Sequence, residues 1–280
     1  MIMQTGVYFH PIFSKGGWPI LGNKFKDFPD VMDDVLQKYN IEIFEPPFPS
    51  EELILKVHTK RYFESVKGRE YFDGAMFSIG GCVEASEKVM NGDLKNALVF
   101  DVAAGHHSGP DYGWGGTYLS VTGPAIVNLR ENFGDIKTAV IDIDSHHGDG
   151  TRAVIEGDPL TMHYCFCSKN HIDDENKNYC TDVGGRTNDE EYLEKLNNIM
   201  LPRLKDFSPD IIILLLGHDT CSGDYGDRGL TPDFFPEAVR IIKEQAETMS
   251  QGKLVTVTMG GARSELTNII IPTSLEALAK

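Results

Sequence analysis

Short apolar runs alternate with longer amphipathic stretches along most of the chain. Four runs are β-branched and apolar at nearly every position, as in parallel-sheet strands that are covered on both faces: 96–104, 138–144, 210–217 and 253–261. Elsewhere apolar residues recur at intervals of three and four, which predicts helices over about 32–39, 82–90, 193–204 and 231–249. This alternation predicts a single α/β domain, residues 1–280, with a central, mostly parallel sheet and helices on both faces.

One long polar stretch interrupts the alternation. Residues 168–191 are rich in charged and amide side chains and show no clear periodicity. We therefore expect a loop at the rim of the domain there.

The composition describes a chain that can bury a sizeable core. Of its 280 residues, 41% are hydrophobic. The formal net charge of −16 argues against binding to nucleic acid or to an anionic membrane and favours cationic ligands. The first residues lack the pattern of a signal peptide, and no apolar run approaches the length of a bilayer span. The five cysteines are scattered and odd in number, so we expect a cytoplasmic protein without a disulfide framework.

Ionisable residues gather where the predicted strands end. The segments that follow the four strands read AAGHHSG, DIDSHHGDG, LGHDTCSGD and TMGGARSE. Ligands of open α/β sheets bind beyond the carboxyl ends of the strands. Asp142, Asp144 and His146 would point to one side of an extended chain, and buried carboxylates there need a cation. With Asp219 as a third ligand, Asp144 and His146 predict a catalytic divalent metal, namely Zn²⁺ or else Fe²⁺ or Co²⁺.

The order and spacing of these motifs resemble the histone deacetylase family, which includes acetoin-utilisation and acetylpolyamine deacetylase-like proteins and has the arginase/deacetylase fold. Three further segments extend the resemblance along the chain: VHTKRYFESV at 57–66, GGCVEASEKVMNG at 80–92 and NDEEYLEKL at 188–196. The resemblance implies a zinc-dependent deacylase that hydrolyses the amide of an acetylated amine, such as acetyl-lysine or an acetylpolyamine.

The resemblance also implies a role for each residue of the site. Asp144, His146 and Asp219 correspond to the zinc ligands, and His106 and His107 to a tandem general acid/base pair. Asp142 and Asp149 correspond to the carboxylates that hydrogen-bond this pair. In the implied mechanism zinc polarises the acyl carbonyl and activates water, His107 with Asp149 accepts the water proton, and a protonated histidine delivers a proton to the leaving amine. A structural K⁺ is implied nearby, with Asp142 as its side-chain ligand.

The chain departs from the family pattern at three places. Arg263 stands where the family has a tyrosine that hydrogen-bonds the substrate carbonyl. Either Arg263 takes the active role of stabilising the oxyanion, or a neighbour by motif does so; these neighbours are Tyr112, Tyr225 and His218. Gly115 and Gly116 follow Trp114 where the family has a phenylalanine wall, which predicts a wider or differently walled tunnel. His218 replaces a small residue and is expected either to line the site or to pack behind it.

Two other functions compete with the deacylase. A catalytically weak or inactive member would keep the metal and bind ligands or partners. A binuclear ureohydrolase is disfavoured because a second set of bridging carboxylates is not evident in the sequence. The acidic balance favours a small cationic acetylated amine as substrate, and the oligomeric state is left open.

We interpret Cys165, Cys167 and His147 as structural residues. Cys165 and Cys167 lack a second closely spaced pair, so their spacing alone does not predict a thiolate metal site. We expect His147 to pack and hydrogen-bond rather than to bind metal.

Overall fold

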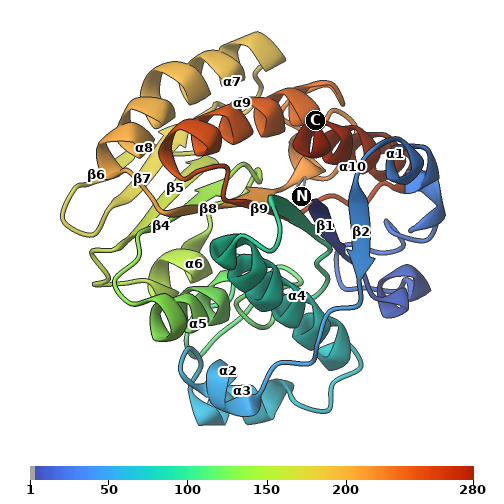
Figure 1. Cartoon of the computed structure of the whole chain (residues 1–280), viewed down its shortest axis with the longest axis vertical. Coiled ribbons are helices and arrows are strands. Elements are labelled where there is room, and N and C mark those ends of the chain that lie inside the picture. The colour runs from blue at the N-terminus through green and yellow to red at the C-terminus, as the bar shows by residue number, and fades with distance from the viewer. Residues whose placement is uncertain (1–3) are drawn as a thin grey trace.

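The computed structural model describes residues 4–280, and within them a nine-stranded sheet lies between layers of helices (Figure 1). The strands lie in the order β2-β1-β3-β9-β8-β4-β5-β7-β6. β6 is antiparallel to β7, and the other neighbouring strands are parallel. The strand bounds are β1 Thr5–Tyr8, β2 Ile41–Phe44, β3 Asn96–Val99, β4 Thr138–Asp142, β5 Thr161–Cys167, β6 His171–Asp173, β7 Asn178–Asp182, β8 Ile211–Leu216 and β9 Leu254–Thr258.

The four strands predicted from apolar runs form the centre of the sheet. They are β3, β9, β8 and β4, and they lie side by side in that order. Each is buried along its whole length, because helices cover both of its faces. The predicted α/β fold with a mostly parallel sheet is therefore confirmed.

Helices α4, α5 and α6 lie on one face of the sheet, and α7 to α10 lie on the other (Figure 1). The helix bounds are α1 Asp33–Lys38, α2 Glu51–Leu55, α3 Lys60–Val66, α4 Phe72–Asn91, α5 Thr122–Phe133, α6 Asp149–Val154, α7 Asp189–Lys195, α8 Leu201–Phe207, α9 Phe234–Met249 and α10 Ser264–Ala279. α4 ends at Asn91, and the next residue, Gly92, has the left-handed backbone that commonly terminates a helix. The helix expected over 193–204 contains a π-helical turn, Leu196–Met200, between α7 and α8. Across residues 4–280, each helix is too short or too polar to cross a membrane.

The expectation of a loop over residues 168–191 was wrong. This stretch contains β6, β7 and the start of α7. β7 is polar in sequence, yet four of its five residues are buried, because it pairs with β5 on one side and β6 on the other. Hydrophobic periodicity cannot detect a strand whose burial comes from pairing rather than from apolar side chains.

The strand order decides where the chemistry lies. Because β3, β9, β8 and β4 are parallel neighbours, the loops after them emerge at one edge of the sheet. These four loops carry the histidine pair, the Asp144–Asp149 segment, Asp219 and the glycines at 260 and 261.

Candidate active site

A pocket of about 170 Å³ opens at this edge of the sheet. Its walls combine ionisable groups with apolar side chains. The lining residues are Ile20, Leu21, Asp101, Ala104, His106, His107, Trp114, Gly115, Gly116, Thr117, Asp144, His146, Tyr225, Met259 and Gly260.

Three potential metal ligands meet at the pocket. Asp144 and His146 come from the loop after β4, and Asp219 comes from the short turn His218–Thr220 after β8. One ligand atom of each lies within 4.8 Å of the others. Nδ1 of His146 is 3.1 Å from Oδ1 of Asp144 and 3.0 Å from Oδ2 of Asp219. Backbone amides hold both carboxylates, since Gly260 N donates to Asp144 and Ser145 N donates to Asp219.

The charge of this cluster fits a divalent cation. Asp144 is 1% exposed and Asp219 is fully buried. Burial and the charge of Asp144 raise the pKa of Asp219, and hydrogen bonds to the two carboxylates raise the pKa of His146 to about 10. Two carboxylates and one imidazole so close together are costly to bury without a positive charge. Their oxygen and nitrogen atoms suit Zn²⁺, Fe²⁺ or Co²⁺.

The histidine pair lies beside the metal ligands, and a carboxylate orients each ring. Nδ1 of His106 lies 2.7 Å from Oδ2 of Asp142, and Nδ1 of His107 lies 2.7 Å from Oδ1 of Asp149. The two ring centroids are 4.1 Å apart. If each Nδ1 carries the hydrogen that its carboxylate accepts, each Nε2 is left for chemistry in the pocket.

The two histidines differ in proton affinity. Burial opposes protonation of His106, but the charges of Asp142 and Asp144 outweigh it and raise the pKa of His106 to about 9. Burial and the neighbouring charge of His106 lower the pKa of His107 to about 4. In the metal-free protein the pair therefore contains one proton donor, His106, and one proton acceptor, His107, near neutral pH.

A glycine brings the histidine pair close to the carboxylate loop. A Cβ added to Gly150 would lie 2.2 Å from the backbone nitrogen of Ser108 and 2.5 Å from the carbonyl carbon of His107. A larger residue at 150 would push the start of α6, and with it Asp149, away from His107.

Trp114 forms a wall of the pocket. Its ring centroid lies 3.8 Å from that of His107, and its Nε1 donates to Oδ2 of Asp149 at 3.0 Å. The indole is half exposed. The pocket is thus walled by Trp114 together with the glycines at 115 and 116. The expectation that the tunnel is wider than in the family, or differently walled, stays a prediction.

Arg263 is not among the residues that line this pocket. It precedes the first turn of α10, and its side chain is 59% exposed. Its Nη1 donates to the carbonyl oxygen of Gly223 at 3.3 Å, and its Nε lies 3.5 Å from a carboxylate oxygen of Glu265. The structure therefore separates Arg263 from the other residues of the predicted site.

A phenol from another loop occupies the pocket. Tyr225 lines it, and the Tyr225 hydroxyl accepts a hydrogen bond of 3.1 Å from the backbone nitrogen of Gly261. A Cβ added to Gly260 would lie 2.8 Å from this hydroxyl and 2.3 Å from Oδ2 of Asp144. The phenol and the carboxylate of Asp144, a candidate metal ligand, thus flank the same small gap. Burial and the charges of Asp144 and Asp219 raise the pKa of Tyr225, so the phenol keeps its proton.

The other two alternatives to Arg263 lie elsewhere. His218 is fully buried behind the pocket, where its Nε2 lies 2.9 Å from Oγ1 of Thr267. Tyr112 lies at the outer side of the histidine pair, where its hydroxyl donates to Oδ2 of Asp149 at 3.3 Å.

Asp142 is fully buried behind His106. Its Oδ1 accepts from the backbone nitrogen of Asp144, and its Oδ2 lies 3.7 Å from Nε2 of His163. Asp142, His163 and Cys165 offer ligand atoms within 4.8 Å of one another. The structural K⁺ near Asp142 stays a prediction.

Sequence reasoning did not single out Asp101, which also lines the pocket. It is 1% exposed and lies close to Lys24, which is fully buried and donates to the carbonyl oxygen of Met259. Burial lowers the pKa of Lys24 and raises that of Asp101. The available signal was that Asp101 is a charged residue inside the apolar run 96–104. Its buried lysine partner lies 77 positions away in the sequence and could not be paired with it from the sequence alone.

Comparison with known proteins places these features in a family context. Residues 30–278 match the sequence profile of the histone deacetylase domain. A probable deacetylase of Archaeoglobus fulgidus is 28% identical, over 92% of this chain and 81% of the relative. A histone deacetylase-like amidohydrolase of Pseudomonas aeruginosa is 27% identical, over 79% of this chain and 66% of the relative. A histone deacetylase of Saccharomyces cerevisiae is 25% identical over 76% of this chain, which spans 36% of that longer protein.

Proposed function

This chain belongs to the histone deacetylase family, and on that premise we propose that it is a zinc-dependent deacylase that hydrolyses the amide of an acetylated amine. The observation that carries the proposal is the meeting of Asp144, His146 and Asp219 beside the histidine pair of the same pocket. When bound, a divalent ion supplies Lewis-acid chemistry, because it polarises a carbonyl group and acidifies water.

The histidine pair divides the proton transfers. His107 is neutral near pH 7, and Asp149 fixes its Nδ1, so its Nε2 accepts the proton of the attacking water. His106 is held by the buried carboxylate of Asp142, which favours the protonated ring, so it donates a proton to the nitrogen of the leaving amine. The pair thus takes up a proton on one ring and delivers one from the other.

Tyr225 stabilises the negative charge that develops on the acyl oxygen. Its neutral phenol flanks the gap beside Asp144. The backbone N–H of Gly261 donates a hydrogen bond to the phenol oxygen. The hydroxyl hydrogen is thereby left for the substrate. This role replaces the one that Arg263 would have had, because the Arg263 guanidinium binds at Gly223 and Glu265 instead.

The substrate that we propose is a small acetylated amine with a positive charge beyond its alkyl chain. Ile20, Leu21 and Met259 give the pocket apolar walls that suit an alkyl chain. Trp114 lines the pocket and is half exposed, and the face of an aromatic ring attracts an alkylammonium group. The net charge of −16 attracts the same group over a longer range.

Turnover of a substrate panel tests the proposal. Acetate release would be measured for metal-loaded protein with acetylpolyamines, acetyl-lysine peptides and neutral N-alkylacetamides, at low and high salt. We expect turnover, with a preference for the cationic substrates that declines as salt screens the charges. Equal rates for cationic and neutral substrates at both salt concentrations would refute the charge preference.

Asp219→Asn links turnover to the metal. We expect this variant to lose about one equivalent of metal and nearly all turnover, because Asp219 is a buried ligand in a three-ligand site. The control is Asp174→Asn, which changes an exposed carboxylate in the β6–β7 turn. If the wild type loaded with zinc, iron or cobalt turned over no member of the panel, the deacylase would be excluded and a non-catalytic, ligand-binding family member would be favoured.

A further inference from the structure

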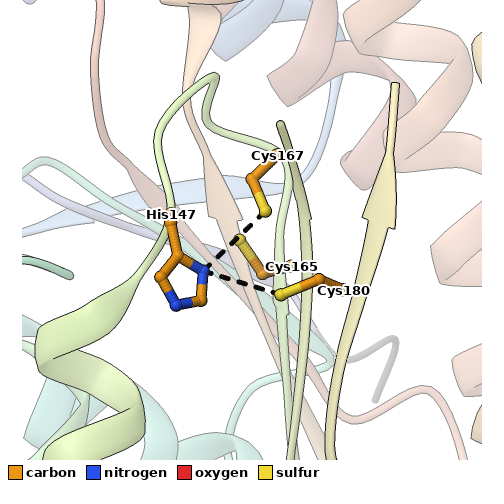
Figure 2. Close-up of side chains that lie close together, drawn as sticks. All are labelled: His147, Cys165, Cys167 and Cys180. Carbon is orange, nitrogen blue, oxygen red and sulfur yellow. Dashed lines mark hydrogen bonds between the residues drawn. The ribbon is translucent and has the colours of Figure 1, made fainter. Parts of the chain in front are cut away.

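Four side chains with metal-binding atoms meet next to the candidate active site: His147, Cys165, Cys167 and Cys180 (Figure 2). One ligand atom of each lies within 4.8 Å of the others. The three cysteines are 0%, 1% and 5% exposed, and their sulfur atoms converge with the imidazole of His147. We propose that these residues form a second metal site, which binds Zn²⁺ or another divalent ion that prefers sulfur ligands.

Three separate segments build this cluster. Cys165 and Cys167 lie two residues apart on β5, so their side chains point to the same face of the sheet. Cys180 is the direct partner of Cys165 on the neighbouring strand β7. His147 comes from the loop between β4 and α6. The sequence did not predict this site, because it shows only the Cys165–Cys167 pair, while Cys180 and His147 come together with that pair only in the folded sheet.

The distances suit ligands around one ion. Nδ1 of His147 lies 3.8 Å from the sulfur of Cys167 and 3.6 Å from the sulfur of Cys180. In a tetrahedral site with metal–sulfur bonds of about 2.3 Å and metal–nitrogen bonds of about 2.0–2.1 Å, ligand atoms lie about 3.5–3.8 Å apart. Three cysteines and one histidine fill all four positions, which is the arrangement of a structural site rather than of a catalytic one.

The surroundings of the cluster offset its charge. Three thiolates and one neutral imidazole around a divalent ion leave one negative charge. Nη2 of Arg152 donates to the sulfur of Cys180 at 3.2 Å and to the carbonyl oxygen of Tyr179 at 3.3 Å. A guanidinium that is hydrogen-bonded to a ligand sulfur stabilises that remaining charge.

The proposed ion connects the active-site loop to the sheet. His147 directly follows His146, and the sulfur of Cys165 lies 3.7 Å from the carbonyl oxygen of His146. An ion bound at the four residues would tie this loop to β5 and β7. The site therefore positions His146 without touching the substrate, and it does not depend on the reaction proposed above.

Cobalt substitution tests the second site by spectroscopy. Metal-free protein, prepared with a chelator under reducing conditions, would be titrated with Co²⁺. We expect a near-ultraviolet charge-transfer band from thiolate to cobalt that rises until the thiolate site is filled and is displaced by Zn²⁺. The active-site ligands Asp144, His146 and Asp219 contain no sulfur and cannot produce this band. Asp219→Asn should therefore keep it, so the test is independent of the proposed activity.

Serine variants assign the band to the cluster. Cys167→Ser and Cys180→Ser should weaken or abolish it, whereas Cys82→Ser, which changes a fully buried cysteine of α4, should keep it. Absence of the band in the wild type, with all thiols free after unfolding, would overturn the proposal. So would a disulfide between Cys165 and Cys180, detected by mass after alkylation without reduction. Both the cobalt titration and the disulfide analysis use the wild type, so the proposal can be refuted even if the serine variants fail to fold.

Discussion

Tyr225→Phe removes one hydroxyl from the pocket and leaves the ring in place beside His146, with the ring centroids 5.8 Å apart. The hydroxyl flanks the gap next to Asp144, where the acyl oxygen of a substrate would develop charge. A hydrogen-bond donor aimed at such a charge contributes about 2.7–4 kcal/mol, which corresponds to a factor of about 10²–10³ in kcat. The variant also loses the acceptor for Gly261 N, which costs about 1 kcal/mol of stability and leaves the fold intact.

Steady-state acetate release from an acetylated amine that the wild type turns over would measure the effect. We expect kcat to fall by about 10²–10³ with little change in KM, because the donor acts mainly in the transition state. Tyr39→Phe is the matched control, since it removes a phenol hydroxyl that binds Glu276 on the far side of the fold. This control should stay within about twofold of the wild type.

Arg263→Ala distinguishes the two candidates for the oxyanion donor. We expect less than about a threefold change, because the guanidinium is exposed and binds at Gly223 and Glu265. A Tyr225→Phe variant that kept more than about half of the wild-type kcat would refute the role of the phenol. Loss of activity in Arg263→Ala at the same time would show that the arginine turns into the pocket when substrate binds.

Two further substitutions test the supports of the site. Asp149→Asn should lower kcat about 10–100-fold without loss of metal, because Asp149 orients the His107 ring through its Nδ1. An unchanged kcat in a variant with unchanged metal content and melting temperature would contradict this role. Gly260→Ala should lower both metal affinity and kcat, because the added Cβ would lie 2.3 Å from Oδ2 of Asp144. The control, Gly185→Ala, has open space around the added carbon and should change neither quantity. Equal metal affinities for the two variants would refute the steric argument.

The central strands and the end-of-strand chemistry could be predicted because both have strong local signals. β8 is apolar at all six positions, and Asp219 follows it within three residues. Parallel pairing then carries the ends of β4 and β8 to the same edge, so strand order alone brings Asp144 and Asp219 together. Such an inference needs no knowledge of side-chain packing.

The parts that the sequence could not predict depend on contacts between segments with weak local signals. Tyr225 was only one of several candidates, because its place beside Asp144 depends on the path of the loop after β8. Cys180 lies in a polar strand that hydrophobic periodicity does not reveal. Its meeting with Cys165 depends on the register between β5 and β7, which hydrogen bonding across the sheet sets.

One four-residue segment, 144–147, supplies ligands to both candidate metal sites, and the sheet explains how it can do so. β4 pairs residue by residue with β8 on one side and β5 on the other, so the start of the segment is fixed. Ile143 N then donates to the carbonyl oxygen of Leu215 at 3.1 Å, so the pairing with β8 continues up to the residue before Asp144. Beyond that point Asp144 and His146 turn toward the pocket, while the side chain of His147 turns toward the cysteines of β5 and β7 (Figure 2). Ligand positions must be held within about 0.5 Å for catalysis, and a segment anchored at one end by a buried strand and at the other by a closed metal site meets that requirement better than a free loop.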